Sequence, residues 1–342
     1  MRTSQEKKGM YAMKKKLLSV LTAAFACCLA FALVGCGDNS DSGSSDTVEN
    51  DLVFTTGGES GTYYAFGTVL ANYASNSTDT QVSAVSSEGS AANIYALQDG
   101  NASLAFCQSD VLSYAYEGTN IFEEDGGYNG FSIVGALYGE QVQIVTCNPD
   151  IKSVADLAGK TVSVGAANSG VYFNAIDILG AYDITLDDIS PVYQSFADSA
   201  DSLKNGKIDA AFIVAGAPTT AITDLTTSKD VYLVGLDADH VAKLCEENPY
   251  YKEATIAKDV YGLDSDTQTV SVLAVVLAND NVSEDAIYNF TSSMFDGAET
   301  QADAHAKYAE LNLETATSIT NVPYHAGAAK YYSEQGIEVA TK

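Results

Sequence analysis

The segments LVFTTGGESGTYY at residues 52–64 and TVSVGAANSGVYF at residues 161–173 follow one pattern. In each, an apolar run rich in β-branched residues leads through glycine to a Ser-Gly pair, and an aromatic pair follows. An apolar run bounded by glycine is typical of a buried strand, and serine ahead of periodic apolar residues is typical of a helix start. Each segment therefore predicts a strand, a turn and a helix in that order.

A second pattern also occurs twice. LQDG at residues 97–100 precedes Phe106, and LKNG at residues 203–206 precedes Phe212 at the same spacing. The copies of the first pattern lie 109 residues apart and those of the second 106, in the same order. Chance is the alternative, because Ser-Gly and Asn-Gly are common turn dipeptides. The matching order and offsets favour two structurally equivalent lobes, each a small α/β unit.

Strands and helices are expected to alternate along the whole chain. Residues 62–74 place Phe66, Val69, Leu70 and Tyr73 on one helical stripe. The segments with strand character are residues 52–56, 81–85, 104–107, 132–137, 142–147, 161–164, 208–214, 231–235 and 270–278. Strand–helix alternation at this spacing predicts parallel strands in an α/β fold.

The long apolar runs at residues 131–147 and 270–278 are expected to connect the lobes. Two such crossings side by side would form a hinge, with a ligand cleft between the lobes. Residues 283–295 and 324–335 are expected to pack back on the first lobe. The predicted division is a leader at 1–36, a tether at 37–50, lobe 1 at 51–138, lobe 2 at 139–269, and a return strand with C-terminal helices at 270–342.

Composition excludes several classes of protein. The chain has 342 residues, 46% of them apolar, with 21 Tyr and 12 Phe, which favours two folded domains over disorder. Arg2 is the sole arginine, and beyond Cys36 the chain has 11 lysines against 44 acidic residues, a balance of −33. Nucleic acid is therefore not an expected partner, because phosphate binding needs clustered Lys and Arg.

The first 36 residues have the pattern of a targeting segment. Lys14, Lys15 and Lys16 precede an apolar run at residues 17–34, and the run ends in LVGC, which resembles the bacterial lipobox. Cys36 is then the lipidated first residue of an extracytoplasmic, membrane-anchored protein. An ordinary transmembrane anchor is the alternative, and the start at Met10 or Met13 stays open. Residues 37–50 are polar and predict a flexible tether.

Motifs for catalysis or metal binding are scarce. Cys107, Cys147 and Cys245 remain after the leader, without the spacing of a zinc site or a disulfide framework. The chain contains no GxSxG, HExxH, P-loop or GxGxxG motif, and its three histidines are scattered. We therefore expect a binding protein with no cofactor and no metal, and not an enzyme.

The repeated Ser-Gly turn suggests how a ligand would be held. A helix start offers unpaired backbone N–H groups and a partial positive charge, glycine lets a ligand approach, and hydroxyl groups add donors. An ordinary N-cap is the other reading of such a turn. The expected cradle is formed by Ser60, Gly61, Thr62, Tyr63, Tyr64, Asn168, Ser169 and Gly170.

Further polar residues follow other expected strands and complete the candidate site. These are Ser87, Ser90, Asn93, Gln108, Asp110, Glu140, Tyr193 and Gly216, with Gln194 beside Tyr193. An acid near the cradle would suit a ligand ammonium group, and Asp110, Glu88 and Glu140 are the candidates. A solvated loop acid is the alternative for each of the three.

Together these motifs resemble a known family. GG at 57–58, GTYY at 61–64, SEGS at 87–90, Asn93, QSD at 108–110, LYGE at 137–140, DLAGK at 156–160, NSG at 168–170, NGKIDA at 205–210 and GAP at 216–218 resemble the solute-binding subunits of TRAP transporters of the TAXI family. The resemblance covers about residues 52–295. Gly139 stands where the family often has proline, and Asn168 where it often has glycine.

The resemblance implies a periplasmic-binding-protein fold of the second type that closes on its ligand by a hinge. It implies a glutamate-like amino acid or another small organic acid as ligand, and delivery to a TRAP membrane permease driven by an ion gradient. The substrate-binding lipoprotein of an ABC importer is the alternative. A surface enzyme on the same scaffold is a further hypothesis, to be tested by turnover of a bound ligand. An adhesin or structural surface protein is another, and it would fail to close around any small molecule.

Overall fold

The computed structural model describes residues 50–124 and 126–342. The expected leader, the lipidation site Cys36 and the tether up to residue 49 lie outside these residues. Within the described part of the chain, no helix combines the length and the apolar character that crossing a bilayer requires.

The first lobe is built on a parallel β-α-β-α-β unit. Its apolar strands pair in parallel because each helix carries the chain back to the end of the sheet at which the previous strand began. The elements are β1 (Asp51–Thr55), α2 (Thr62–Ser77), β2 (Gln81–Val85), α3 (Ser90–Gln98) and β3 (Leu104–Gln108), with β1 paired in parallel to both β2 and β3.

The second lobe repeats the same unit. Its elements are β5 (Thr161–Ser163), α5 (Gly170–Ala181), β6 (Ser190–Val192), α6 (Phe196–Lys204) and β7 (Ala210–Ala215), with β5 paired in parallel to both β6 and β7. The strand order across the sheet is β2-β1-β3-β10-β4-β7-β5-β6, so each half mirrors the order of the other. The two equivalent lobes expected from the repeated motifs are therefore confirmed.

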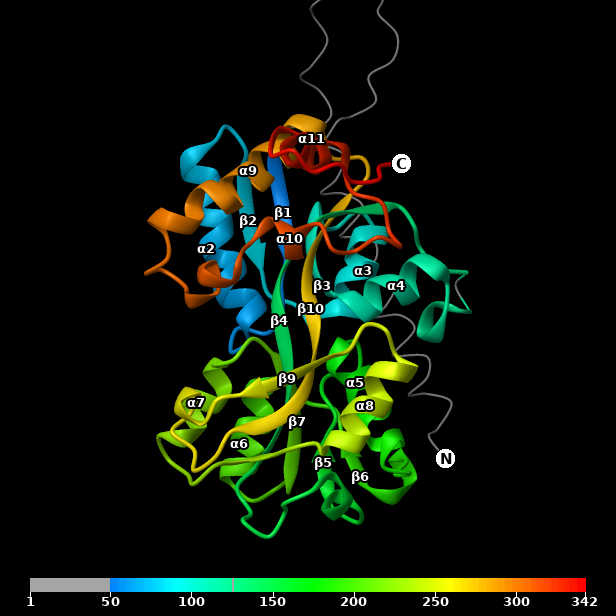
Figure 1. Cartoon of the computed structure of the whole chain (residues 1–342), viewed down its shortest axis with the longest axis vertical. Coiled ribbons are helices and arrows are strands. Elements are labelled where there is room, and N and C mark those ends of the chain that lie inside the picture. Colours follow the sequence, from blue (N-terminus) through cyan, green and yellow to red (C-terminus); the bar gives the residue numbers. More distant parts are fainter. Residues whose placement is uncertain (1–49, 125) are drawn as a thin grey trace, which may run out of the picture. The chain divides into compact units, whose positions relative to one another are not determined.

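Two long strands connect the lobes. β4 (Phe131–Thr146) and β10 (Thr267–Asn279) pair antiparallel, from Phe131 opposite Asn279 to Gln141 opposite Ser271. They run next to each other through both lobes (Figure 1). Both crossings were expected from the sequence. The segments expected as separate strands at 132–137 and 142–147 are one continuous strand, because Tyr138 to Gln141 keep the ladder with β10.

Each lobe has its own hydrophobic core. The lobe 1 core draws on residues 52–138 and 274–332, together with Phe173, whereas the main lobe 2 core draws on residues 142–272. In β7, Ala210, Phe212 and Val214 belong to that core, while Ala211 and Ile213 belong to a third cluster on the other face. The alternation follows from the two-residue period of a strand. The lobe boundaries given above stay a prediction.

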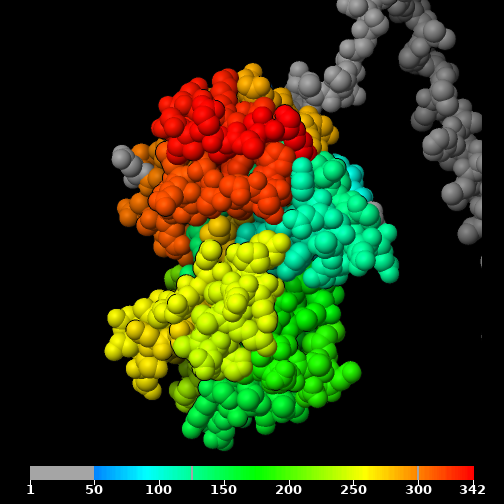
Figure 2. All heavy atoms as spheres, turned by 45° about the vertical axis from the view of Figure 1, so that its right-hand side comes forward, coloured from blue at the N-terminus to red at the C-terminus, as the bar shows by residue number. Residues whose placement is uncertain are grey.

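The C-terminal segment packs on lobe 1, as expected. Phe290 of α9 (Glu284–Thr300) meets Phe54 edge to face with ring centres 5.7 Å apart. Tyr332 of α11 (Ala326–Glu334) donates a hydrogen bond to the carbonyl oxygen of Val134 on β4 at 2.8 Å. Figure 2 shows the last residues of the chain, coloured red, covering this end of lobe 1.

Two edge strands were not expected from the sequence. β6 has three residues including Pro191, and β9 (Lys252–Ile256) begins with two exposed charged residues. Neither has a clear apolar run, because an edge strand buries only part of its surface.

The remaining strand, β8 (Tyr232–Val234), pairs with β4, and β9 pairs with β10. The remaining α-helices are α4 (Ser109–Glu117), α7 (Thr220–Thr226), α8 (Ala238–Glu247) and α10 (Leu313–Ala316).

Candidate ligand-binding site

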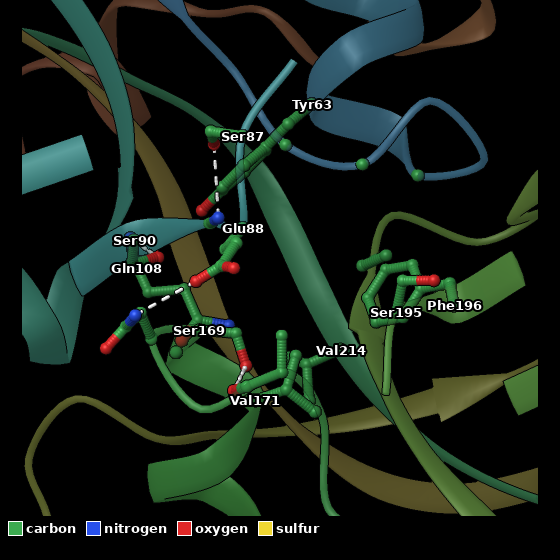
Figure 3. A pocket seen from close by; sticks show the side chains of 18 of the residues that line it. Tyr63, Ser87, Glu88, Ser90, Gln108, Ser169, Val171, Ser195, Phe196 and Val214 are labelled. Atoms are coloured by element: carbon green, nitrogen blue, oxygen red, sulfur yellow. Dashed lines mark hydrogen bonds between the residues drawn. The ribbon is translucent and has the colours of Figure 1, made fainter. Parts of the chain in front are cut away.

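A pocket of about 460 Å³ lies between the lobes. Its walls come from the loops that follow β1, β2, β5 and β6, from the last residues of β3 and β7, and from Glu140 on β4. Apart from Glu140, these residues lie at the carboxyl ends of parallel strands, where open α/β sheets bind ligands. Figure 3 shows Tyr63, Ser87 and Glu88 at the upper side of the pocket and Ser169 and Val171 at the lower side, with Ser195 and Phe196 to the right.

Five helices begin at residues that line the pocket, and the N-cap residues of four of them, α2, α3, α4 and α5, make no side-chain hydrogen bond to the helix start; α4 follows Gln108. α2 follows Gly61, α3 follows Gly89 and α5 follows Ser169, and these residues line the pocket. By contrast, Ser195 caps α6 by accepting from the N–H of Asp198. The first N–H groups of a helix have no partner within the helix. That of Ala92 in α3 donates to the carbonyl oxygen of Asn168, and an anion in the pocket would accept from the remaining ones and would meet the positive ends of the helix dipoles.

Glycine is required where the lobes approach each other. A Cβ atom on Gly170 would lie 1.7 Å from Oε1 of Gln108 in the other lobe, so any other residue there would force the Gln108 amide to move. Gly89 has φ of +115°, a backbone conformation that favours glycine, and its ideal Cβ would lie 3.4 Å from Cβ of Ser169. Gly89 and Gly170 therefore allow the starts of α3 and α5 to approach each other closely at the pocket.

Hydrogen bonds join the lobes at several places beside the pocket. At one, Asn168 donates from Nδ2 to Oε2 of Glu88 at 2.9 Å, and the N–H of Ala92 donates to the carbonyl oxygen of Asn168 at 3.1 Å. At another, Thr62 donates from Oγ1 to the carbonyl oxygen of Gly216 at 2.9 Å. The N–H of Ala221 also donates to the carbonyl oxygen of Ser60, at 3.2 Å. The lobes are thus in contact around the pocket.

Glu140 is a buried acid in the pocket wall. It lies on β4 with 2% of its surface exposed, and Tyr63 donates a hydrogen bond to its Oε2 at 2.6 Å. Burial raises the pKa of Glu140 to about 8, an effect that the hydrogen bond from Tyr63 opposes. The phenol ring of Tyr63 is held by stacking on Phe106, with ring centres 4.5 Å apart.

The pocket lining is acidic and has no cationic side chain. Glu88, Glu140 and Asp198 line it, whereas no lysine, arginine or histidine of the described residues does. Lys307 is buried nearby, but it pairs with Glu310 and lies 5.2 Å from the ring centre of Tyr138. A ligand anion here would depend on N–H groups and hydroxyls, as the sequence predicts.

The structure brings together most of the site residues predicted from the sequence. Those that line the pocket are Gly61, Thr62, Tyr63, Ser87, Ser90, Gln108, Glu140, Asn168, Ser169, Gly170 and Tyr193. The segments 60–64 and 169–173 thus contribute to opposite walls of one cleft. That these residues bind a ligand remains a proposal.

Five predicted site residues do not line the pocket. Ser60 and Gly216 lend carbonyl oxygens to the contacts between the lobes, and Tyr64 lies half-buried on α2. Asn93 is fully buried and donates to the carbonyl oxygens of Thr56 and Phe106, each at 2.7 Å. Asp110 is buried beside the pocket and accepts from Nδ2 of Asn174 at 3.0 Å. Their polar character, which drew attention in the sequence, serves the scaffold instead.

Several lining residues carry no signal that sequence reasoning used. Ala166, Ala167, Val171, Val214 and Ala215 are apolar and indistinguishable from core residues. Ser195, Phe196 and Asp198 belong to the start of α6, and the Ser-x-x-Asp pattern there is a capping signal that could have marked this further helix start. Within the described residues no cluster of His, Cys, Asp and Glu is placed to hold a metal ion.

A family model described as the NMT1-like family matches residues 54–336. This chain belongs to the NMT1-like family. Its fold is the two-lobed α/β fold of type II periplasmic binding proteins, with the hinge strands and interlobe cleft expected from the sequence. The fold class is thereby confirmed.

Solved structures share the fold of this NMT1-like chain at low identity. The ligand-binding component of an ABC-type import system from Staphylococcus aureus, solved with zinc bound, is 10% identical with a TM-score of 0.50, over 86% of this chain and 94% of that one. A protein of Bordetella bronchiseptica RB50 is 18% identical with a TM-score of 0.50, over 83% and 89%. The periplasmic aliphatic sulphonate-binding protein SsuA of Escherichia coli is 17% identical with a TM-score of 0.45, over 84% and 90%.

Proposed function

We propose that this chain is the extracytoplasmic solute-binding component of a membrane importer, and that it captures a small carboxylate such as glutamate or a related amino or organic acid. The observation that carries the proposal is the pocket between the lobes at which α2, α3 and α5 begin without side-chain caps. Three helix starts directed at one pocket supply N–H donors and dipole ends for a carboxylate.

The same pocket favours binding over catalysis. Its lining contains serine and tyrosine hydroxyls but no histidine, lysine or cysteine of the described chain that could activate a nucleophile. Hinge strands joining two lobes around a pocket also suit a receptor that closes on its ligand and opens to release it.

The partner that receives the ligand is a membrane permease. The motifs at 57–64, 87–90 and 108–110 support a TAXI-type TRAP permease driven by an ion gradient. The alternative is an ABC importer, since the fold is shared with a ligand-binding component of an ABC-type import system. Uptake into vesicles that contain each candidate permease separates the two: the first needs an ion gradient and the second needs ATP.

The proposed location is the outer side of the cell membrane, with a lipid on Cys36 as the anchor. The pattern of residues 1–36 supports it. Mass spectrometry of the membrane-extracted protein tests the anchor, because a mature chain that begins at a diacylated Cys36 has a distinct mass. A chain that retains residues 1–35 would contradict it.

Ligand binding is tested by thermal stability with a panel of amino and organic acids. A ligand present at 100 times its Kd adds about 2.7 kcal/mol to the free energy of unfolding. Gly61→Val should reduce that stabilisation, since a Cβ there already lies 3.3 Å from the ring of Phe196 across the cleft. If no acid in the panel stabilises the parent protein, the proposal is wrong.

A further inference from the structure

The carboxyl group of Glu140 has an unusual position for an acid in a binding protein. It lies in the wall of the pocket, almost fully buried, on one of the two strands that cross between the lobes. Its hydrogen-bond donor is the hydroxyl of Tyr63, and no lysine, arginine or histidine of residues 50–124 and 126–342 forms an ion pair with it. An ionised carboxylate without a cation in such a place is costly, so Glu140 keeps its proton while the pocket is empty.

The groups that face Glu140 from its neighbouring elements support the neutral form. They are Tyr63 on α2, Cys107 on β3, Asp110 on α4, Tyr138 on β4 and Lys307 in the 3-10 helix at Ala306–Glu310. Tyrosine and thiol are neutral, and Asp110 disfavours a second negative charge. Lys307 favours ionisation, but its ammonium group is already paired with Glu310. Burial therefore dominates, and it raises the pKa of Glu140 to about 8.

The pocket also contains acceptors that lack a donor. The amide oxygens of Gln108 in lobe 1 and Gln194 in lobe 2 are buried and accept no hydrogen bond, although both residues line the pocket. A buried acceptor without a partner costs free energy until something donates to it. A carboxylate ligand has no N–H or O–H to offer at neutral pH, whereas an ammonium group has three N–H donors and a positive charge.

We propose that Glu140 is the specificity-determining residue of this pocket: it selects ligands that carry an ammonium group and releases its proton when such a ligand binds. The inference rests on the proposed function and names the group that Glu140 recognises. The proton balance is simple. The O–H bond of neutral Glu140 breaks, the proton passes to solvent, and the carboxylate left behind pairs with the ammonium group, which keeps all of its own protons.

The test compares ligands that share a carbon skeleton and differ in the amine: glutamate with glutarate, aspartate with succinate, and alanine with propionate. Calorimetric titration in two buffers of different ionisation enthalpy counts the protons exchanged. At pH 7 an amino acid should release about 0.9 proton, since that fraction of an acid with a pKa near 8 is protonated. The matched acid without an amine should bind more weakly and release none.

Affinity should change with pH in a direction set by the ligand. An amino acid needs ionised Glu140, so its affinity should rise roughly 50-fold from pH 6 to pH 8 as the cost of removing the proton falls. The affinity for a matched acid without an amine should not rise between pH 6 and pH 8. It should fall above pH 8, where Glu140 is charged.

Two variants test whether the released proton comes from Glu140. Glu140→Gln keeps a neutral acceptor for Tyr63 and cannot ionise, so it should weaken amino-acid binding by at least about 30-fold and abolish proton release. It should leave the matched acid within about 3-fold, because that ligand meets a neutral group in both proteins. Glu247→Gln makes the same change of charge at an exposed position of α8, outside the pocket lining, and should retain proton release.

The outcomes separate this inference from the proposed function. Equal binding of each matched pair by the parent protein, without proton release, overturns the role of Glu140 while the receptor function stands. Failure of every acid in the three pairs and in the wider panel overturns the receptor function itself. Because the proton count is measured on the unmodified protein, a variant that does not fold leaves the test intact.

Discussion

Asn174 in lobe 2 donates a hydrogen bond of 3.0 Å from Nδ2 to Oδ2 of Asp110 in lobe 1, and both side chains are buried. The contact continues into lobe 2, because Asn174 also donates to the hydroxyl of Tyr251, which in turn donates to Asp177 at 2.9 Å. Close by, the rings of Tyr114 on α4 and Tyr250 meet edge to face. Asp110 is thus the lobe 1 end of a polar contact that holds the two lobes together.

The first prediction concerns the pH dependence that Asp110 imposes on stability. Burial, with a further contribution from the nearby charge of Asp177, raises the pKa of Asp110 to about 7. The folded chain then binds this proton more tightly than the unfolded chain, so the contribution of Asp110 to stability is lost as pH rises from about 4 to about 7. At pH 8 the free energy of unfolding of the Asp110→Asn variant should therefore be about 2 to 4 kcal/mol higher than that of the parent.

Urea unfolding at pH 5 and pH 8 measures that difference. At pH 5 the gap should largely close, because the parent then carries a neutral Asp110. Asp201→Asn, at an exposed position of α6, is the matched control and should change stability by less than about 0.5 kcal/mol at either pH. A destabilised Asp110→Asn protein at pH 8 would show that the ionised carboxylate is needed for the contact.

The second prediction concerns closure of the cleft. Gly170→Ala places a methyl group 1.7 Å from Oε1 of Gln108, so either the buried Gln108 amide is displaced into the pocket or the lobes cannot approach as closely. Ligand affinity should fall by about 100-fold or more, while the lobes stay folded, because each has its own core. Titration calorimetry with the best acid of the panel measures the loss.

Gly180→Ala is the control for that variant. It lies on the same helix, and a Cβ there meets nothing within 4 Å. Its affinity should match that of the parent, with stability equal or higher by up to about 1 kcal/mol. Gln108→Ala combined with Gly170→Ala should restore closure, measured by small-angle scattering with ligand. If Gly170→Ala alone closes around the ligand as fully as the parent, the steric argument is wrong.

The third prediction concerns Asn168 at the mouth of the pocket. Its hydrogen bond to Glu88 joins the lobes, but both side chains are exposed, so the bond competes with water. Asn168→Gly should weaken ligand binding by no more than about 5-fold, mainly through faster dissociation. Stopped-flow measurement of ligand release checks this, and a loss near 100-fold would mean that Asn168 contacts the ligand directly.

The fourth prediction tests whether Asn93 stabilises the fold or contacts the ligand. Its Nδ2 group links the carbonyl oxygens that follow β1 with that of Phe106 on β3, all in the buried interior. Asn93→Ala removes a buried donor from both oxygens, of which that of Thr56 keeps the hydroxyl of Ser87, and should cost about 1 to 3 kcal/mol of stability. Chemical unfolding measures the cost, with the exposed Gln98→Ala on the same helix as control. Lost affinity at unchanged stability would instead place Asn93 at the ligand.

Much of the fold could be predicted because the lobes repeat. The Ser-Gly turns before α2 and α5 lie at equivalent positions of two β-α-β-α-β units, and the long apolar runs are the crossing strands. β6 and β9 could not be predicted, because short edge strands with proline or charged residues have no apolar pattern.

The site was predictable only where its chemistry is polar. Gly61, Ser169 and Glu140 carry a signal because glycine, hydroxyl and carboxyl groups are informative outside a core. Val214 and Ala166 are not distinguishable from packing residues. Conversely, Asn93 and Asp110 resemble site residues in sequence, and only the tertiary arrangement shows that they hold backbone and lobes together.

The division of the two cores decides when each lobe can form during synthesis. The lobe 2 core draws on the continuous stretch 142–272, whereas the lobe 1 core also needs β10, α9 and α11 near the end of the chain. The half that is translated second can therefore fold first. Lobe 1, although its first strands come earlier in the chain, lacks a complete core until β10, α9 and α11 are present, so it stays accessible to proteases and chaperones for longer.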